Sequence, residues 1–286
     1  MRASCGSSPR SSRRRSRGSP ADSWAARVNT ARNGASGGGY LHTPPPRVLA
    51  HRGLATEAPE NTLLAFAKAL AVGVTHIETD VHESSDGVAV ISHDDTLDRI
   101  AGRAVRVDQL TSVELRRVDL GAGQGFATLS EAIDAFPDAR FNIDIKSAGA
   151  VEPTIAAIRS LNAIDRVLVT SFSDARRRAA VKGLPGVATS ASFGTMAKVL
   201  LASRLRWRRR ARALLASVDA VQLPERWKGV QVVTPPLIRM ARAAGTEVHV
   251  WTINEPDDMV RLLDLGVDGI VTDRADLAID IVRSRR

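Results

Sequence analysis

Short apolar runs alternate with segments of helical periodicity along this chain, beginning at Arg47. Most of the runs are rich in β-branched residues, which is typical of strands buried on both faces. The pattern predicts eight such strands: Val48–His51, Ile77–Val81, Phe141–Ile145, Val167–Ser171, Val187–Ala191, Val218–Leu223, Val248–Thr252 and Gly269–Thr272.

The segments between these runs read as helices: Glu60–Val72, Leu129–Phe136, Val151–Leu161, Asp174–Lys182, Pro235–Ala244, Pro256–Leu265 and Ala275–Arg283. Pro235 and Pro256 stand where a first helical turn tolerates proline, and glycines such as Gly245 and Gly266 stand where helices end. Eight strands alternating with helices predict an α/β fold of the (β/α)8 TIM barrel type. The alternative fold is an open doubly wound sheet. The sequence gives it no support, because no Gly-x-Gly-x-x-Gly motif follows the first strand.

One connection is too long for an ordinary loop, namely the stretch of about residues 94–127. Within it, Thr111–Leu115 reads as a short helix, and Val88–Ser92 just before it reads as an extra strand. We therefore expect a small inserted subdomain after the second strand, at the mouth of the barrel.

Composition divides the 286 residues into a tail and a domain. Residues 1–46 hold eight arginines and one aspartate, a net charge of +7, which leaves only +2 of the total +9 for residues 47–286. We predict that residues 1–46 are a disordered basic tail with a Gly/Pro linker, and that residues 47–286 are the barrel. A nearly balanced barrel gives no reason to expect a nucleic-acid partner. Cys5 is the one cysteine, so no intramolecular disulfide forms.

The chain shows no credible export signal, because no apolar stretch follows the arginines at positions 13–15. No apolar run approaches the ~18 residues of a membrane-spanning helix. These features favour the cytoplasm. The segment Ser203–Arg212 gathers six arginines around Trp207, which predicts a solvated surface helix; the alternative is a peripheral contact with an anionic membrane.

Acidic side chains occur in pairs along the predicted strands. Glu78 and Asp80 are two residues apart on the second strand, so their carboxylates lie on the same side, and Asp144 has a similar place on the third. Burying these acids is costly without a partner charge. A divalent cation held by Glu78, Asp80 and Asp144 would supply it, and all-oxygen ligation favours Mg²⁺, Ca²⁺ or Mn²⁺.

Other candidate residues lie beside these acids at the ends of strands, where barrel enzymes keep their catalytic groups. His51 and His93 are the histidines expected to function, whereas His42, His76, His82 and His249 are expected to be structural. Arg52 carries a planar fork suited to a phosphate. Lys146 is a phosphate-facing cation or a partner of Asp144, and Trp251 is an apolar wall of the site or a core residue.

From Arg47 onward the sequence resembles the glycerophosphodiester phosphodiesterase family. The resembling stretches run in order along nearly the whole domain: AHRGLATEAPENT, IETDVHESSDGVAVISHDDTLDR, FNIDIK, VWTIN and LGVDGIVTDRADL. Their combination is far more specific than any one of them. The tail lies outside the resemblance.

The resemblance implies a TIM barrel with a small insertion and a divalent-metal phosphodiesterase activity. It implies the following roles: His51 and His93 as the acid–base pair; Glu78, Asp80 and Asp144 as metal ligands; Arg52 and Lys146 near the phosphate; and Trp251 at the glycerol-side wall. Asp144 stands where the family usually has glutamate, so a shorter arm would reach for the ion.

The predicted reaction is hydrolysis of a small-molecule glycerophosphodiester to glycerol 3-phosphate and an alcohol. Two alternatives remain open at this stage. One is a phospholipase D-like or phosphoinositide-cleaving barrel that acts on intact lipid, and the other is a non-catalytic ligand-binding barrel.

Overall fold

The computed structural model describes residues 39–285 except residues 57 and 206, and for residues 203 and 204 it describes the backbone alone. Of the basic tail expected over residues 1–46, residues 1–38 therefore lie outside the described residues. The folded part extends ahead of Arg47, because Tyr40 is buried and its ring meets the edge of His76 at a centroid distance of 5.0 Å.

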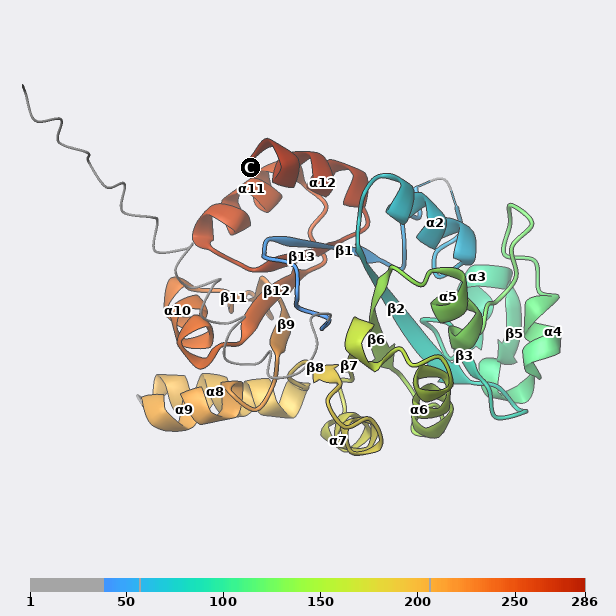
Figure 1. Cartoon of the computed structure of the whole chain (residues 1–286), viewed down its shortest axis with the longest axis horizontal. Helices are drawn as coiled ribbons and strands as arrows, with labels where there is room; N and C mark the ends of the chain where they lie inside the picture. The colour runs from blue at the N-terminus through green and yellow to red at the C-terminus, as the bar shows by residue number, and fades with distance from the viewer. Residues whose placement is uncertain (1–38, 57, 206, 286) are drawn as a thin grey trace, which may run out of the picture. The chain divides into compact units, whose positions relative to one another are not determined.

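Eight parallel strands form a nearly closed barrel surrounded by helices (Figure 1). In order around the ring the strands are β8 (Ala188–Thr189), β7 (Val167–Thr170), β6 (Arg140–Ile145), β2 (His76–Glu83), β1 (Arg47–His51), β13 (Gly269–Thr272), β12 (Glu247–Trp251) and β9 (Ala220–Pro224). An isolated bridge between Ser190 and Ala220 joins β8 to β9. The expected (β/α)8 barrel is confirmed, and each predicted run contains or overlaps one of these strands.

The helices that cover the strands begin and end close to where the sequence places them, except α8 and α9, for which the sequence predicted only the segment Ser203–Arg212. They are α2 (Leu63–Ala71), α5 (Leu129–Ala135), α6 (Val151–Ser160), α7 (Asp174–Gly183), α8 (Phe193–Arg204), α9 (Arg208–Leu215), α10 (Pro235–Ala244), α11 (Pro256–Leu265) and α12 (Ala275–Ser284). Thr62 and Thr234 cap α2 and α10 through their hydroxyls, and Gly245 and Gly266 end α10 and α11 in the left-handed conformation. Within the described residues, no helix is long and apolar enough to cross a membrane.

The arginine-rich segment Ser203–Arg212 is not the single surface helix that the sequence predicted. It spans the end of α8 and the start of α9, and the backbone N–H of Trp207 bonds to the carbonyl of Ala202 at 2.8 Å. Trp207 has the non-helical angles φ −78° and ψ 60°, which separate the two helices. The prediction was wrong because the charge pattern says nothing about where the backbone turns.

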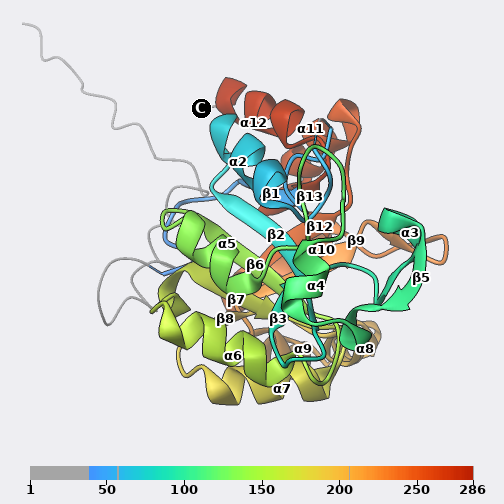
Figure 2. The same ribbon diagram turned by 90° about the vertical axis from the view of Figure 1, so that its right-hand side faces the viewer.

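The connection after β2 folds as the small inserted unit that the sequence predicted. β3 (Ala89–Ile91) pairs antiparallel with β2, and then follow β4 (Thr96–Leu97), α3 (Asp98–Ala101), β5 (Arg103–Arg106), a 3-10 turn (Val107–Gln109) and α4 (Ser112–Arg116). Leu97, Leu115 and Phe126 belong to a hydrophobic cluster of its own. Figures 1 and 2 show α3, β5 and α4 together at one side of the barrel.

A buried ion pair stabilises the end of the barrel where the strands begin. Arg47 at the start of β1 donates from Nε and Nη2 to the two carboxylate oxygens of Glu247, at 2.7 and 2.8 Å. His249 lies 3.0 Å from the same carboxylate, and all three side chains are almost fully buried. Burial alone would raise the pKa of Glu247, but the hydrogen bonds from Arg47 and His249 outweigh it and hold the pKa at about 2.

We predict that Glu247→Gln lowers the free energy of unfolding by about 3 kcal/mol at pH 7, from 1.36 kcal/mol per pKa unit. Because the folded-state pKa lies below the ordinary value of 4.5, this stability is complete above that value and is lost as the pH falls toward about 2. Urea unfolding followed by circular dichroism should show the gap between the two proteins narrowing below pH 4.5. Asp280→Asn, at an exposed carboxylate, is the control. A gap independent of pH would contradict this account.

Candidate functional site

A cavity of about 900 Å³ opens where the barrel strands end. All eight residues singled out from the sequence line it: His51, Arg52, Glu78, Asp80, His93, Asp144, Lys146 and Trp251. They come from β1, β2, β6 and β12 and from the loops that follow β1, β3 and β6. The structure therefore brings together side chains that lie up to two hundred residues apart in the sequence.

His51 ends β1 and is held by a carboxylate from the last strand. Its Nδ1 lies 2.6 Å from Oδ1 of Asp273, the residue that follows β13, and Asn254 donates to the other oxygen of Asp273 at 2.8 Å. Burial disfavours the charged imidazole, but the Asp273 hydrogen bond and the nearby Glu78 outweigh burial and raise the pKa of His51. Because Nδ1 is hydrogen-bonded to Asp273, Nε2 is the ring nitrogen that can accept or donate a proton in a reaction.

A sharp turn after His51 places Arg52. Both Arg52 and Gly53 adopt left-handed backbone angles, with φ of 58° and 88°. A side chain at Gly53 would put its Cβ 2.7 Å from the carbonyl carbon of Ala65, so only glycine fits. The turn directs the backbone N–H of Arg52 to the carboxylate of Glu78 at 3.2 Å.

His93 has its own carboxylate partner, and the inserted unit holds that partner in place. Nδ1 of His93 lies 2.7 Å from Asp94, and Arg99 of α3 donates to Asp94 and Glu60, each at 2.6 Å. Glu60 in turn accepts from Arg52 at 2.9 Å. These ion pairs connect Arg99 of the inserted unit to His93 through Asp94 and to Arg52 through Glu60.

Three buried carboxylates crowd the centre of the site. β2 carries Glu78 and Asp80 on one side, and Asp144 on β6 is the register partner of Asp80. The ammonium of Lys146 lies between Asp80 and Asp144, at 2.8 and 2.7 Å from their oxygens. The sequence left open whether Lys146 pairs with Asp144, and the structure shows that it contacts both acids.

The positive charges near these acids do not balance them. Burial and the charge of Asp80 raise the pKa of Glu78 well above its ordinary range. Burial also raises the pKa of Asp144. At Asp80, by contrast, Lys146 and Arg52 outweigh burial and lower the pKa. The cluster therefore carries more carboxylate than its cations can compensate, and another cation would relieve it.

The carboxylate and amide oxygens here suit a hard divalent cation, although the described residues do not form a preorganised metal site. Among the described residues, no three His, Cys, Asp or Glu side chains are arranged to enclose a metal ion, and Lys146 lies between two of the predicted ligands. However, Oδ1 of Asp144 and Oδ1 of Asn142 are buried and have no hydrogen-bond partner within the described part of the chain. Unsatisfied buried oxygens beside surplus carboxylates are suitable ligands for Mg²⁺ or Ca²⁺.

Sequence reasoning missed Asn61 and Asp273, which form hydrogen bonds with side chains that line the cavity. Asn61 donates to Asp80 at 3.1 Å and accepts from Thr79 at 2.8 Å, whereas the sequence suggested only a place near the cap of α2. Asp273 follows the last strand directly, so the strand-end rule that identified His51 also identifies it. The sequence signal for Asn61 is weaker, because Asn61 lies in the loop before α2 and its partners Thr79 and Asp80 lie on β2.

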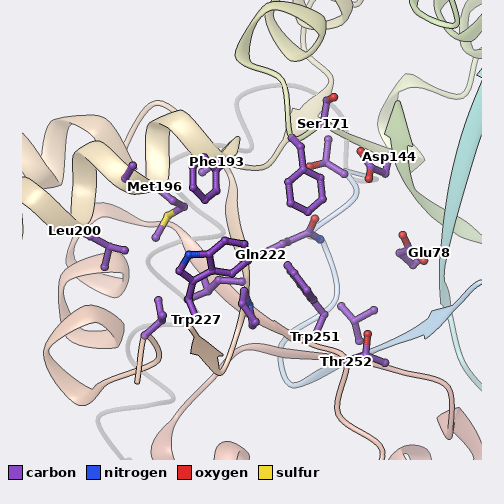
Figure 3. Close-up of a pocket in the computed structure, with 18 of the residues that line it drawn as sticks. Glu78, Asp144, Ser171, Phe193, Met196, Leu200, Gln222, Trp227, Trp251 and Thr252 are labelled. Carbon is purple, nitrogen blue, oxygen red and sulfur yellow. The ribbon is translucent and has the colours of Figure 1, made fainter. Parts of the chain in front are cut away.

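The cavity also has an apolar half that the sequence did not predict, apart from Trp251. Figure 3 shows Glu78 and Asp144 at one end, Trp251 and Gln222 in the middle, and Phe193 and Trp227 farther on. Trp251 meets the edge of Phe172 at a centroid distance of 6.3 Å. Trp251 therefore forms a wall of the cavity.

The histidines that the sequence assigned to structure lie outside the cavity lining. His76 and His249 are buried near the start of the barrel strands, and burial lowers the pKa of His76 to about 3. His82, the third buried histidine of this group, contacts the backbone carbonyl of His93 through Nε2 at 3.3 Å. His82 thereby supports the loop that carries His93.

Comparison with known proteins agrees with this geometry. The sequence model of the glycerophosphoryl diester phosphodiesterase family matches residues 51–277. The chain is 47% identical to the probable glycerophosphodiester phosphodiesterase 2 of Mycobacterium tuberculosis, over 83% of this chain and 90% of that one. It is 32% identical to a glycerophosphodiester phosphodiesterase of Caldanaerobacter subterraneus, over 82% and 97%. The crystal structure of such an enzyme from Agrobacterium tumefaciens matches with a TM-score of 0.67 and 26% identity, over 83% and 99%.

We predict that Asp273→Asn lowers the pKa of His51. The carboxylate at 2.6 Å favours the charged imidazole, and an amide in its place does not. A pH titration of the imidazole signals by NMR checks this, with His51→Gln used to assign the resonance. Asp276→Asn, whose carboxylate pairs with Arg274, is the matched control and should leave the titration unchanged. An unchanged His51 titration in Asp273→Asn would exclude the dyad.

Proposed function

The chain belongs to the glycerophosphoryl diester phosphodiesterase family, and we propose that it hydrolyses glycerophosphodiesters to glycerol 3-phosphate and an alcohol. One observation carries the proposal. Two histidines, each paired through Nδ1 with its own carboxylate, line one cavity together with Arg52, Lys146 and the buried acids. Proton donors, proton acceptors and phosphate-binding cations in one cavity are what phosphodiester hydrolysis requires.

His51 and His93 would act as the acid–base pair. One imidazole takes a proton from the attacking hydroxyl at Nε2, and the other gives a proton to the leaving oxygen. Asp273 and Asp94 are positioning residues, since each fixes the ring orientation of its histidine. Arg52 and Lys146 would bind the phosphate, and Trp251 would wall the glycerol side.

A divalent cation would be held by Glu78, Asp80 and Asp144. When bound, it supplies positive charge to a phosphate oxygen in the transition state. The support for this site is the surplus of buried carboxylate and the unpartnered oxygen of Asp144. Because Asp144 is one methylene shorter than the usual glutamate, we expect the choice among Mg²⁺, Ca²⁺ and Mn²⁺ to differ from that of relatives with glutamate.

We also propose a peripheral contact between α9 and anionic membranes. Arg208, Arg209 and Arg210 are exposed, and Trp207 beside them is 52% exposed. Basic side chains with an interfacial tryptophan suit lipid phosphates. Arg212 of α9 is exposed as well, and Arg204 and Arg206, the remaining arginines on which the idea rested, lie outside the side chains that the structure describes.

We predict that His51→Gln and His93→Gln each lower kcat for glycerophosphocholine by about 10²- to 10⁴-fold, the usual contribution of general acid–base catalysis. Coupled detection of glycerol 3-phosphate measures the rate. His42→Gln is the control, because His42 is exposed and lies outside the cavity lining. Unchanged turnover in both variants would refute the assignment.

Metal removal is predicted to abolish release of glycerol 3-phosphate from glycerophosphocholine and glycerophosphoethanolamine. The purified full chain would be treated with EDTA, passed through a desalting column and assayed with Mg²⁺, Ca²⁺ or Mn²⁺ restored. Recovery with one of these ions, and its weakening in Asp144→Ala, is the expected result. Full activity in the chelated protein would show that Lys146 and Arg52 alone compensate the phosphate charge.

A further inference from the structure

Arg99 of the inserted unit contacts two carboxylates that belong to two different parts of the site. Its Nε donates to Oδ2 of Asp94 and its Nη2 donates to Oε1 of Glu60, each at 2.6 Å. Asp94 holds Nδ1 of His93 through its other oxygen, at 2.7 Å. Glu60 accepts from Arg52 through the same oxygen that Arg99 contacts. One guanidinium therefore connects, through one carboxylate on each side, a proposed acid–base histidine to a proposed phosphate ligand.

The anchoring of the inserted unit does not explain these contacts. Arg99 lies on α3, which packs beside β5 (Figure 2). Leu97, just before α3, is fully buried, and Ile100 packs against the same hydrophobic cluster. The side chain of Arg99 is 51% exposed, and exposed ion pairs add little to stability. Apolar packing therefore holds α3 in place, and the two ion pairs of Arg99 need another explanation.

The contact with Asp94 restricts the orientation of His93. One oxygen of Asp94 bonds to the imidazole and the other bonds to Arg99, so the carboxylate cannot turn without breaking one of these bonds. Burial alone would raise the pKa of Asp94, but the hydrogen bonds from His93 and Arg99 outweigh it and lower the pKa. Ser92 donates to the backbone carbonyl of Asp94 at 2.8 Å, which fixes the main chain but not the carboxylate. Arg99 thereby limits rotation of the imidazole that lines the cavity.

The contact with Glu60 affects Arg52 in a different way. Burial alone would raise the pKa of Glu60, but the hydrogen bond from Arg99 and the charge of Arg52 outweigh it and lower the pKa. Arg52 donates to Glu60 at 2.9 Å, so this carboxylate competes with a bound phosphate for the same guanidinium. Arg99 compensates part of the charge on Glu60, which weakens the attraction between Glu60 and Arg52. Removal of Arg99 would therefore strengthen that ion pair at the expense of the phosphate.

We propose that Arg99 is a positioning residue of the reaction, which aligns His93 through Asp94 and, through Glu60, keeps Arg52 available to the phosphate. The inference rests on the proposed phosphodiesterase function and gives the inserted unit a role in it. Arg99 itself lies outside the lining of the cavity, so it acts through the two carboxylates and does not need to touch the substrate.

The first test measures hydrolysis of glycerophosphocholine by the metal-loaded full chain and by Arg99→Ala. Looser alignment of His93 should lower kcat, and the stronger ion pair between Glu60 and Arg52 should raise KM. The combined fall in kcat/KM should be about 10- to 100-fold, the scale of a small misplacement of reacting groups.

Arg106→Ala is the matched control for this test. Arg106 lies in the same inserted unit, is 47% exposed and also pairs with two carboxylates, those of Asp95 and Asp108. Its removal should leave kcat and KM unchanged, because neither of these carboxylates lines the cavity. Circular dichroism of both variants checks that each is folded.

Chemical rescue separates positioning from a purely structural role. Because the side chain of Arg99 is half exposed, methylguanidinium at millimolar concentration should enter the space left in Arg99→Ala, bridge the two carboxylates and recover most of the lost kcat/KM. It should have no effect on Arg106→Ala. In a protein that already carries Asp94→Asn and Glu60→Gln, adding Arg99→Ala should cost less than about twofold, because both of its charged partners are gone.

The outcomes separate this inference from the proposed function. Turnover that Arg99→Ala leaves intact, or a loss that methylguanidinium does not restore, overturns the positioning role and leaves the phosphodiesterase function standing. If the unchanged protein does not hydrolyse glycerophosphocholine, the proposed function fails, and calorimetric titration with glycerol 3-phosphate decides the role of Arg99 at Arg52. Binding that weakens in Arg99→Ala and recovers with methylguanidinium supports that role, whereas equal binding by both proteins, or none by either, rejects it.

Discussion

Three carboxylates buried within one barrel cannot all be charged without cations beside them, and this constraint organises the site. The parallel register of β2 and β6 brings Asp80 next to Asp144, and Glu78 lies two residues earlier on the same side of β2. The ammonium of Lys146 lies 2.8 Å from Asp80 and 2.7 Å from Asp144 and compensates these two charges. The third remains under-compensated, so the centre of the barrel is built to receive positive charge.

The opposite end of the same barrel shows what full compensation looks like. Arg47 and Glu247 are joined by two short hydrogen bonds, and His249 contacts the same carboxylate. Each of these three side chains has a partner, and their role is structural. Where the strands end, by contrast, Glu78 and Asp144 have raised pKa values, and one oxygen of Asp144 has no hydrogen-bond partner among the residues that the structure describes. Incomplete compensation therefore distinguishes Glu78 and Asp144 from Glu247.

The sequence predicted the barrel, and it singled out eight side chains that the structure places along one cavity, because both depend on local patterns. A buried parallel strand is a short apolar run and its last residue lies at the cavity, so the position of His51 could be predicted. Glu78 and Asp80 could be predicted from their spacing of two residues on one strand. Asn61 and the partner role of Asp273 could not, since Asp273 meets His51 across 222 residues. The break between α8 and α9 was also missed, because a run of arginines gives no signal for a turn.

The apolar half of the cavity escaped sequence reasoning for a related reason. α8 and the hairpin of β10 (Arg226–Trp227) and β11 (Val230–Gln231) are separate in the sequence, and only the fold places Phe193 against Trp227. The acids lie at the other end of the same cavity, so one cavity has a charged end and an apolar end (Figure 3). Local patterns could not predict this contrast, because it arises only when strands and helices far apart in the sequence close around one space.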